Sequence, residues 1–188
     1  MELLQAGSSI LVVVDIQGRL AATIPDIDWI VETTRFLVDI AIAGGVPTIA
    51  TEQHPDGLGP TVPALRALLL DSGLIIPKLA FSAVKEAIFL ERILEAHING
   101  RHQVILCGLE AHICVLQTAI ELTQHGFDVA VVADAVGARR TYDGDIALDR
   151  LTQAGVQIVT ADMVAYEWLE RAGTDRFRSL LPLLRNRG

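Results

Sequence analysis

Short apolar stretches recur along the chain, and longer amphipathic stretches separate most of them. The apolar stretches are rich in β-branched residues and nearly continuous rather than alternating, which is typical of strands covered on both faces. We predict strands at residues 9–15, 47–52, 74–78, 103–108, 128–134 and 156–160.

The stretches between these strands carry apolar residues at helical spacing and run into glycine, the usual helix-stop residue. We predict helices within residues 29–45, 84–100, 113–126 and 143–155, and two more after Asp162. Alternating strands and helices favour a parallel sheet, because right-handed crossovers place helices on both of its faces. The pattern therefore predicts an α/β fold: a three-layer α/β/α sandwich with a six-stranded, mostly parallel, Rossmann-like sheet.

The length and composition narrow the possible partners. At 188 residues the chain predicts a single domain over residues 1–188. A net charge of -8 argues against a nucleic-acid partner, since such binders present a basic face. No apolar run approaches the roughly 20 residues of a membrane span, and the first nine residues contain no lysine or arginine. We therefore expect no membrane association and a cytoplasmic location.

In open α/β sheets, ligands bind beyond the carboxyl ends of the strands. Among the residues expected there are Asp15, Lys78 and Cys114. The sequence contains neither of the two common glycine-rich phosphate-binding motifs, so we expect no nucleotide cofactor.

These three residues have complementary chemistry. A thiolate is a strong nucleophile, and a nearby cation or a helix N-terminus lowers the pKa of its thiol. Cys114 lies at the N-terminus of a predicted helix, Lys78 supplies a cation, and Asp15 is placed to accept and return a proton. Each also has a structural explanation: a buried cysteine, a solvated lysine, an aspartate cap. Cys107, within a predicted strand, is expected to be buried and structural.

Several motifs resemble those of the isochorismatase-like, or cysteine hydrolase, superfamily. They are VVVDIQ (12–17), PKLAFSA (77–83), GLEAHICV (108–115), GFDVAVVADAVGAR (126–139) and ALDRLTQAG (147–155). The first three carry an aspartate, a lysine and a cysteine in the superfamily's order. The chain looks most similar to the isochorismatase domain-containing subgroup, whose substrates are poorly defined.

The resemblance implies a role for each of the three residues. Cys114 is the implied nucleophile, Asp15 the general base and acid, and Lys78 the electrostatic activator. It also implies a cis peptide between Leu109 and Glu110, with the backbone N–H groups of Glu110 and Cys114 forming an oxyanion hole. The expected activity is hydrolysis of a small amide or related acyl compound, a C–N bond other than a peptide bond, through a Cys thioester.

The resemblance also sets limits. Nicotinamidases of this superfamily hold a metal with an aspartate and several histidines after the second strand, whereas TEQHPDGLGP (51–60) contains the single His54. We predict no metal and no cofactor. Glu110 departs from the small residue of many related amidases, and its carboxylate is expected to repel an anionic substrate or raise the thiol pKa.

Weaker candidates surround this constellation. Candidate substrate-pocket residues are Gln17, Gln53, Phe81 and Ala111, and Trp29 is a further wall residue. Structural roles are the alternative for each: strand-end glutamines often satisfy loop backbone, and aromatic residues pack in cores. Arg139 and Arg140 follow the fifth strand and meet either a carboxylate or solvent. The apolar face of the last segment favours a homo-oligomer, with burial against the sheet as the alternative.

Three other functions stay open at this level. The first is binding of a small molecule or a partner without useful catalysis. The second is hydrolysis of an isochorismate-like vinyl ether. The third is peroxide sensing, in which Cys107 resolves an oxidised Cys114. True isochorismatases commonly lack the cysteine, so Cys114 favours amide or ester cleavage.

Overall fold

The computed structural model describes residues 2–185, and in them six strands form one sheet. The strands are β1 (Ser9–Val14), β2 (Thr48–Gln53), β3 (Gly73–Lys78), β4 (Gln103–Leu109), β5 (Asp128–Gly137) and β6 (Gln157–Val159). Their order is β3-β2-β1-β4-β5-β6, and every neighbouring pair is parallel. The predicted strands are confirmed, and the sheet is parallel throughout rather than mostly.

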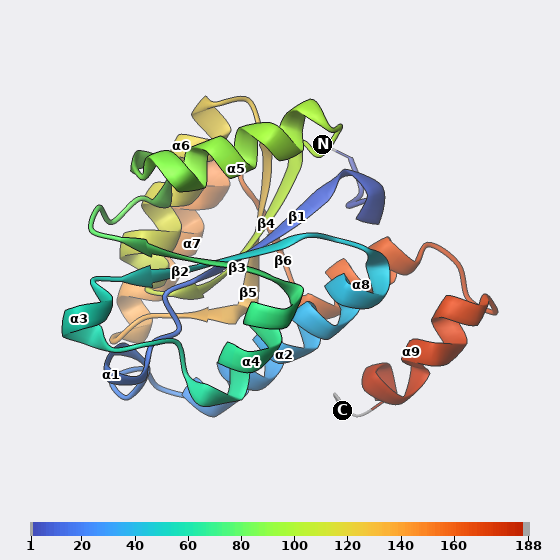
Figure 1. Cartoon of the computed structure of the whole chain (residues 1–188), viewed down its shortest axis with the longest axis horizontal. Coiled ribbons are helices and arrows are strands. Elements are labelled where there is room, and N and C mark those ends of the chain that lie inside the picture. Colours follow the sequence, from blue (N-terminus) through green and yellow to red (C-terminus); the bar gives the residue numbers. More distant parts are fainter. Residues whose placement is uncertain (1, 186–188) are drawn as a thin grey trace.

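Helices cover both faces of this sheet, which confirms the predicted α/β/α layering (Figure 1). One face carries α2 (Ile27–Gly44), α4 (Pro63–Ser72) and α8 (Ala161–Leu169), and the other carries α5 (Ala87–Ile98), α6 (Leu116–Gln124) and α7 (Thr141–Gln153). Leu11 and Val13 of β1 pack on the first face. Val12 and Val14 pack on the second. Both faces are buried, which explains the continuous apolar runs in the sequence. No helix within residues 2–185 has the length and apolar character to cross a membrane.

Shorter elements fill the connections. They are α1 (Gly18–Ala21), α3 (Pro55–Leu58), 3-10 turns at Ala6–Ser8 and Ala83–Lys85, and a π-helical turn at Ala111–Val115. The segment 52–63 contains the end of β2, all of α3 and one side of an isolated bridge between Gln17 and Thr61. The helix expected from residue 113 starts with the π-helical turn, so Cys114 lies inside this turn, which leads directly into α6.

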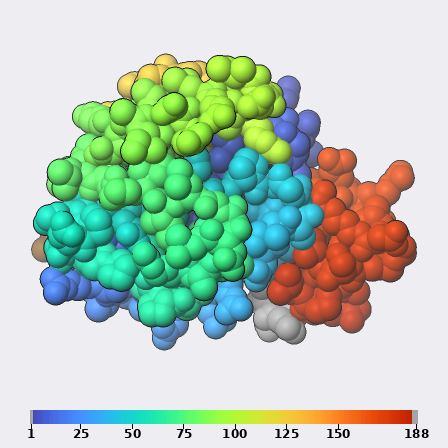
Figure 2. Space-filling view, viewed as in Figure 1, coloured from blue at the N-terminus to red at the C-terminus, as the bar shows by residue number. Residues whose placement is uncertain are grey.

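The last segment forms two helices, as predicted: α8 and α9 (Asp175–Arg185). Trp168, Leu169 and Leu180 are buried in the core on the α2 face. The chain therefore covers much of the apolar face that favoured an oligomer. Figure 2 shows this segment as a red block at one end of the molecule, and in Figure 1 α9 lies at the opposite end from α3, which follows β2.

The strand register aligns the carboxyl ends of the central strands. Val14 pairs with Thr51 of β2 and with Gly108 of β4. The strand order reverses between β1 and β4, where α/β sheets form their ligand crevices. Gly108 has a φ of 115°, and a Cβ there would clash with the carbonyl oxygen of Val14. Only glycine allows β4 to lie this close to the end of β1.

Candidate active site

Asp15 and Lys78 form an ion pair that is closed off from solvent. Lys78 Nζ lies 2.7 Å from Asp15 Oδ2, and neither side chain has exposed surface. Thr51 Oγ1 donates a hydrogen bond of 2.7 Å to Asp15 Oδ1. Sequence analysis missed Thr51, although a threonine on the neighbouring strand beside a strand-end aspartate was an available signal.

The Lys78 ammonium is fixed by further oxygens. It donates to Gln53 Oε1 at 2.6 Å, to the Phe81 carbonyl at 3.1 Å and to the Ala80 carbonyl at 3.3 Å. β2, β3 and the loop after β3 thus hold the ammonium beside Asp15. Its position depends on backbone oxygens as well as on side chains.

The loop after β3 is joined to the helix that follows Cys114. The Ala83 N–H donates to Thr118 Oγ1 at 3.0 Å, and Ser82 Oγ donates to Glu121 Oε2 at 2.7 Å. Thr118 and Glu121 both belong to α6. These bonds connect the loop that follows Lys78 to the helix that follows Cys114.

Cys114 lies next to the ion pair. The residue is 5% exposed, and Sγ is 4.0 Å from Gln53 Oε1, the same oxygen that accepts a hydrogen bond from Lys78. Asp15 and Lys78 are both near enough to alter the titration of the thiol. The structure therefore brings Asp15, Lys78 and Cys114 together at the sheet edge where the sequence placed them.

The expected lowering of the Cys114 pKa is wrong. Burial raises the pKa of this thiol from 9.0 to about 12, the Asp15 carboxylate raises it as well, and Lys78 opposes both effects. The positive charge of Lys78 is already paired with Asp15, so little of it is left to favour a thiolate. Burial also raises the pKa of Asp15, against the opposing effects of Lys78 and Thr51, which makes this carboxylate a better proton acceptor than an ordinary one.

This arrangement predicts how Cys114 reacts as the pH changes. In a Cys107→Ser background, alkylation by iodoacetamide is expected to follow an apparent pKa above 9.0. Lys78→Met should shift that pKa upward, because the attraction to the thiolate is lost. Asp15→Asn should shift it downward, because the repulsion is lost. Intact-mass spectrometry over a pH series measures all three, and a pKa below 9.0 in the parent would contradict the burial argument.

Glu110 is buried and paired, which sequence analysis did not foresee. Its Oε2 accepts hydrogen bonds from the Arg139 backbone N–H at 3.1 Å and from Arg139 Nε at 3.0 Å. The peptide between Leu109 and Glu110 is cis, as the resemblance implied. Arg139 thus meets a carboxylate of the protein itself, whereas Arg140 is exposed. Burial and the Asp15 carboxylate raise the pKa of Cys114, and Glu110, which is paired with Arg139, is not among the causes.

The two candidate glutamines are engaged within the protein. Gln17 is fully buried, its Nε2 donates to the carbonyls of Gln53 and Gly59, and its Oε1 accepts the Gln53 N–H at 2.7 Å. Gln53 Nε2 donates to the Leu79 carbonyl at 2.8 Å. Gln17 therefore satisfies loop backbone, the structural alternative, and fixes the strand end that carries Gln53.

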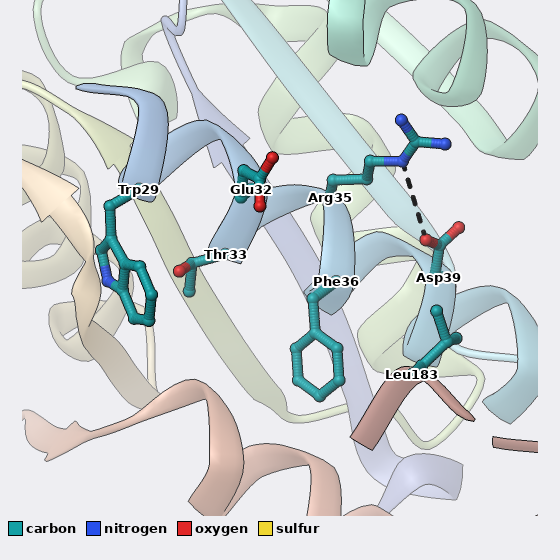
Figure 3. A pocket seen from close by; sticks show the side chains of 7 residues that line it. All are labelled: Trp29, Glu32, Thr33, Arg35, Phe36, Asp39 and Leu183. Carbon is teal, nitrogen blue, oxygen red and sulfur yellow. Dashed lines mark ion pairs between the residues drawn. The ribbon is translucent and has the colours of Figure 1, made fainter. Parts of the chain in front are cut away.

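The other pocket candidates are spread over different surfaces. Phe81 is 55% exposed, and Ala111 is buried and lines a pocket of about 250 Å³. Trp29 lines this pocket too, and also a groove of about 270 Å³ that Phe36 and Leu183 border (Figure 3). Phe81 lines neither, so Trp29 and Phe81 do not wall one of these pockets together.

Neither His54 nor Cys107 lies where it could take part in the proposed chemistry. Across residues 2–185, no group of three or more His, Cys, Asp or Glu side chains is arranged to hold a metal ion. His54 is exposed at the start of α3. Cys107 is free and packs in the core on the α2 face, whereas Cys114 packs on the α6 face. The sheet separates the two thiols, so Cys107 is not positioned to resolve an oxidised Cys114.

Comparisons with known proteins agree with this geometry. The Isochorismatase domain model matches residues 9–163. The chain is 35% identical over 181 residues to isochorismatase domain-containing protein 2 of Danio rerio, covering 96% of this chain and 89% of that one. The MAR1 ribonuclease of Caenorhabditis elegans matches with a TM-score of 0.89 at 34% identity, covering 98% of this chain and 93% of that one. The YcaC gene product of Escherichia coli, described as an octameric hydrolase of unknown specificity, matches with a TM-score of 0.86 at 30% identity and the same coverage.

Proposed function

Because the chain belongs to the isochorismatase family of hydrolases, we propose that it is a metal-independent cysteine hydrolase of a small amide or related acyl compound. Cys114 forms a thioester, Asp15 transfers protons and Lys78 supplies positive charge, without a cofactor. The observation that carries the proposal is the 2.7 Å ion pair of Asp15 and Lys78, buried beside the Cys114 thiol.

The raised thiol pKa sets the order of events. Cys114 is protonated near neutral pH, so the nucleophile has to be generated as it attacks. Asp15 accepts the thiol proton while sulfur forms a bond to the carbonyl carbon of the substrate. Asp15 then gives that proton to the departing nitrogen as the C–N bond breaks, leaving the thioester.

Water completes the cycle. Asp15 accepts a proton from the attacking water molecule, the new C–O bond forms, and the C–S bond breaks. The proton returns from Asp15 to the Cys114 sulfur, and the carboxylic acid leaves. Lys78 stabilises the carboxylate form of Asp15 and the negative charge that passes through the sulfur.

A turn next to the nucleophile supplies the rest of the proposed machinery. The Glu110 carbonyl accepts the N–H groups of Ile113 at 3.0 Å and Val115 at 3.2 Å, which closes the turn around Cys114. We assign the backbone N–H groups of Glu110 and Cys114 to the substrate oxyanion, as the resemblance implies. The distance from these two N–H groups to the negatively charged substrate oxygen determines how strongly they stabilise it.

Two other substrate classes are less well supported. Vinyl-ether hydrolysis gives no role to the Cys114 thiol, which packs directly against the ion pair. RNA, suggested by the description of the C. elegans neighbour, requires cations that meet phosphates. This chain has a net charge of -8, and Lys78 is buried in an ion pair. We propose a small-molecule substrate and no nucleic-acid or membrane partner.

The proposal also covers the location and the assembly of the protein. We propose a single hydrolase domain over residues 1–188 in the cytoplasm, where the two free cysteines stay reduced. A homo-oligomer is supported by the octameric E. coli relative and by exposed apolar side chains that include Leu79, Phe81 and Tyr142.

Acyl-enzyme formation tests the proposal. The protein is mixed with p-nitrophenyl acetate and, separately, with a panel of primary amides, a vinyl ether and an RNA oligonucleotide. We expect a burst of p-nitrophenolate, ammonia release from at least one amide, and an acyl group on the peptide that contains Cys114. Cys107→Ser should retain all three signals. Hydrolysis of the vinyl ether or the RNA alone would contradict the amide assignment, and turnover without Cys114 acylation would contradict the thioester.

A further inference from the structure

We infer that Arg139 is a positioning residue for the proposed nucleophile, because it neutralises the buried Glu110 carboxylate at the start of the turn that carries Cys114. The inference rests on the proposed function. It assigns a role to a contact between the residue that follows β4 and the segment after β5, which connects the exposed surface to the turn around Cys114.

Two hydrogen bonds from Arg139 hold the Glu110 side chain. Both the backbone N–H and the Nε of Arg139 donate to the same oxygen, Oε2 of Glu110, at 3.1 Å and 3.0 Å. The Glu110 side chain is 5% exposed, whereas that of Arg139 is 56% exposed. The carboxylate is therefore held inside the protein by a cation that reaches in from solvent.

The Glu110 backbone ties this contact to the nucleophile. Its carbonyl accepts the N–H groups of Ile113 and Val115, the two neighbours of Cys114. Glu110 is thus joined to Arg139 through its side chain and to the turn around Cys114 through its backbone. A shift of the Glu110 side chain would be transmitted to the turn.

The Glu110–Arg139 contact affects the proposed reaction through its charge as well as through packing. The proposed reaction places negative charge on the Cys114 sulfur and on the substrate oxygen. An unpaired, buried carboxylate a few residues away would oppose both, because charges interact strongly where water is excluded. With Arg139 in place, the Glu110–Arg139 pair carries no net charge.

Three variants test this role. Arg139→Ala is expected to slow Cys114 alkylation and lower kcat by roughly tenfold or more, with little change in KM. Arg140→Ala, at the exposed neighbouring position, is the matched control and should stay within about twofold of wild type. Glu110→Gln/Arg139→Ala should recover to within about threefold of wild type, because the glutamine oxygen still accepts the backbone N–H of residue 139 and brings no charge.

The readouts separate this role from simple support of the fold. Wild-type rates in Arg139→Ala would overturn the inference, and so would a double variant as slow as Arg139→Ala. If Arg139→Ala does not fold, Glu110→Gln/Arg139→Ala is compared with Glu110→Gln, and a large difference between them overturns it. A wild-type protein that never acylates Cys114 would instead overturn the proposed function, and the inference with it.

Discussion

Cys114→Ser is expected to lower kcat on the order of 10⁴-fold while changing the free energy of unfolding by no more than about 1 kcal/mol. A serine hydroxyl is a weaker nucleophile than a thiol, and its proton is harder for Asp15 to remove. Serine also fits the small buried volume at the turn, where Cys114 is 5% exposed. Steady-state hydrolysis and urea unfolding measure the two effects on the same sample.

Cys107→Ser is the matched control for this experiment. Cys107 is fully buried in β4, with its Sγ 3.8 Å from the Val12 carbonyl, on the sheet face away from Cys114. Its replacement is expected to cost some stability and to leave kcat nearly unchanged. Equal losses of activity in both variants would assign the effect to packing, and a Cys114→Ser variant within tenfold of wild type would contradict the thioester.

Lys78→Met is expected to lower kcat on the order of 10³-fold and to reduce the free energy of unfolding by about 3–5 kcal/mol at neutral pH. The methionine fills much of the space of the lysine stem but leaves the Asp15 carboxylate buried without its cation. Thr51 still donates one hydrogen bond to Asp15, which does not compensate for the lost charge. Urea unfolding and steady-state kinetics check the two numbers.

The stability loss of Lys78→Met should depend on pH. Burial already raises the pKa of Asp15 above 3.8, and loss of Lys78 raises it further. The native state then binds this proton more tightly than the unfolded state, so stability falls as the pH rises from 3.8 through the pKa in the folded protein. The deficit of the variant should therefore shrink in acid.

A double variant separates stability from catalysis. Asp15→Asn/Lys78→Met removes both charges and should regain most of the stability at neutral pH, but none of the activity. A double variant as unstable as Lys78→Met would show that the unpaired Asp15 charge does not cause the stability loss of Lys78→Met. Activity in Lys78→Met within tenfold of wild type would contradict the proposed electrostatic role of the lysine.

The fold was predictable because its physical causes are local in the sequence. β1 is buried on both faces, so residues 10–14 are all apolar, and the parallel arrangement follows from the helices between strands. The end of each parallel strand is also a local feature, which is why Asp15 and Lys78 were placed at the same edge. Their approach to 2.7 Å required the register of three strands.

Two properties of the candidate site were not predictable in this way. The direction of the Cys114 pKa shift depends on how deep the thiol lies and on whether Lys78 is already paired with Asp15. The pairing of Glu110 with Arg139 joins residues 29 positions apart and depends on a register shift between β4 and β5 after Leu106. Both are consequences of three-dimensional packing that sequence spacing does not encode.

The close approach of β4 to the end of β1 has an evolutionary consequence. Any side chain at position 108 would push against Val14, the residue immediately before Asp15, and would move the proposed proton acceptor away from the Cys114 thiol. Homologues that keep this chemistry are therefore under selection to keep a residue without a side chain there. Loss of that glycine in a lineage would mark the loss of the proposed reaction even where the aspartate, lysine and cysteine persist.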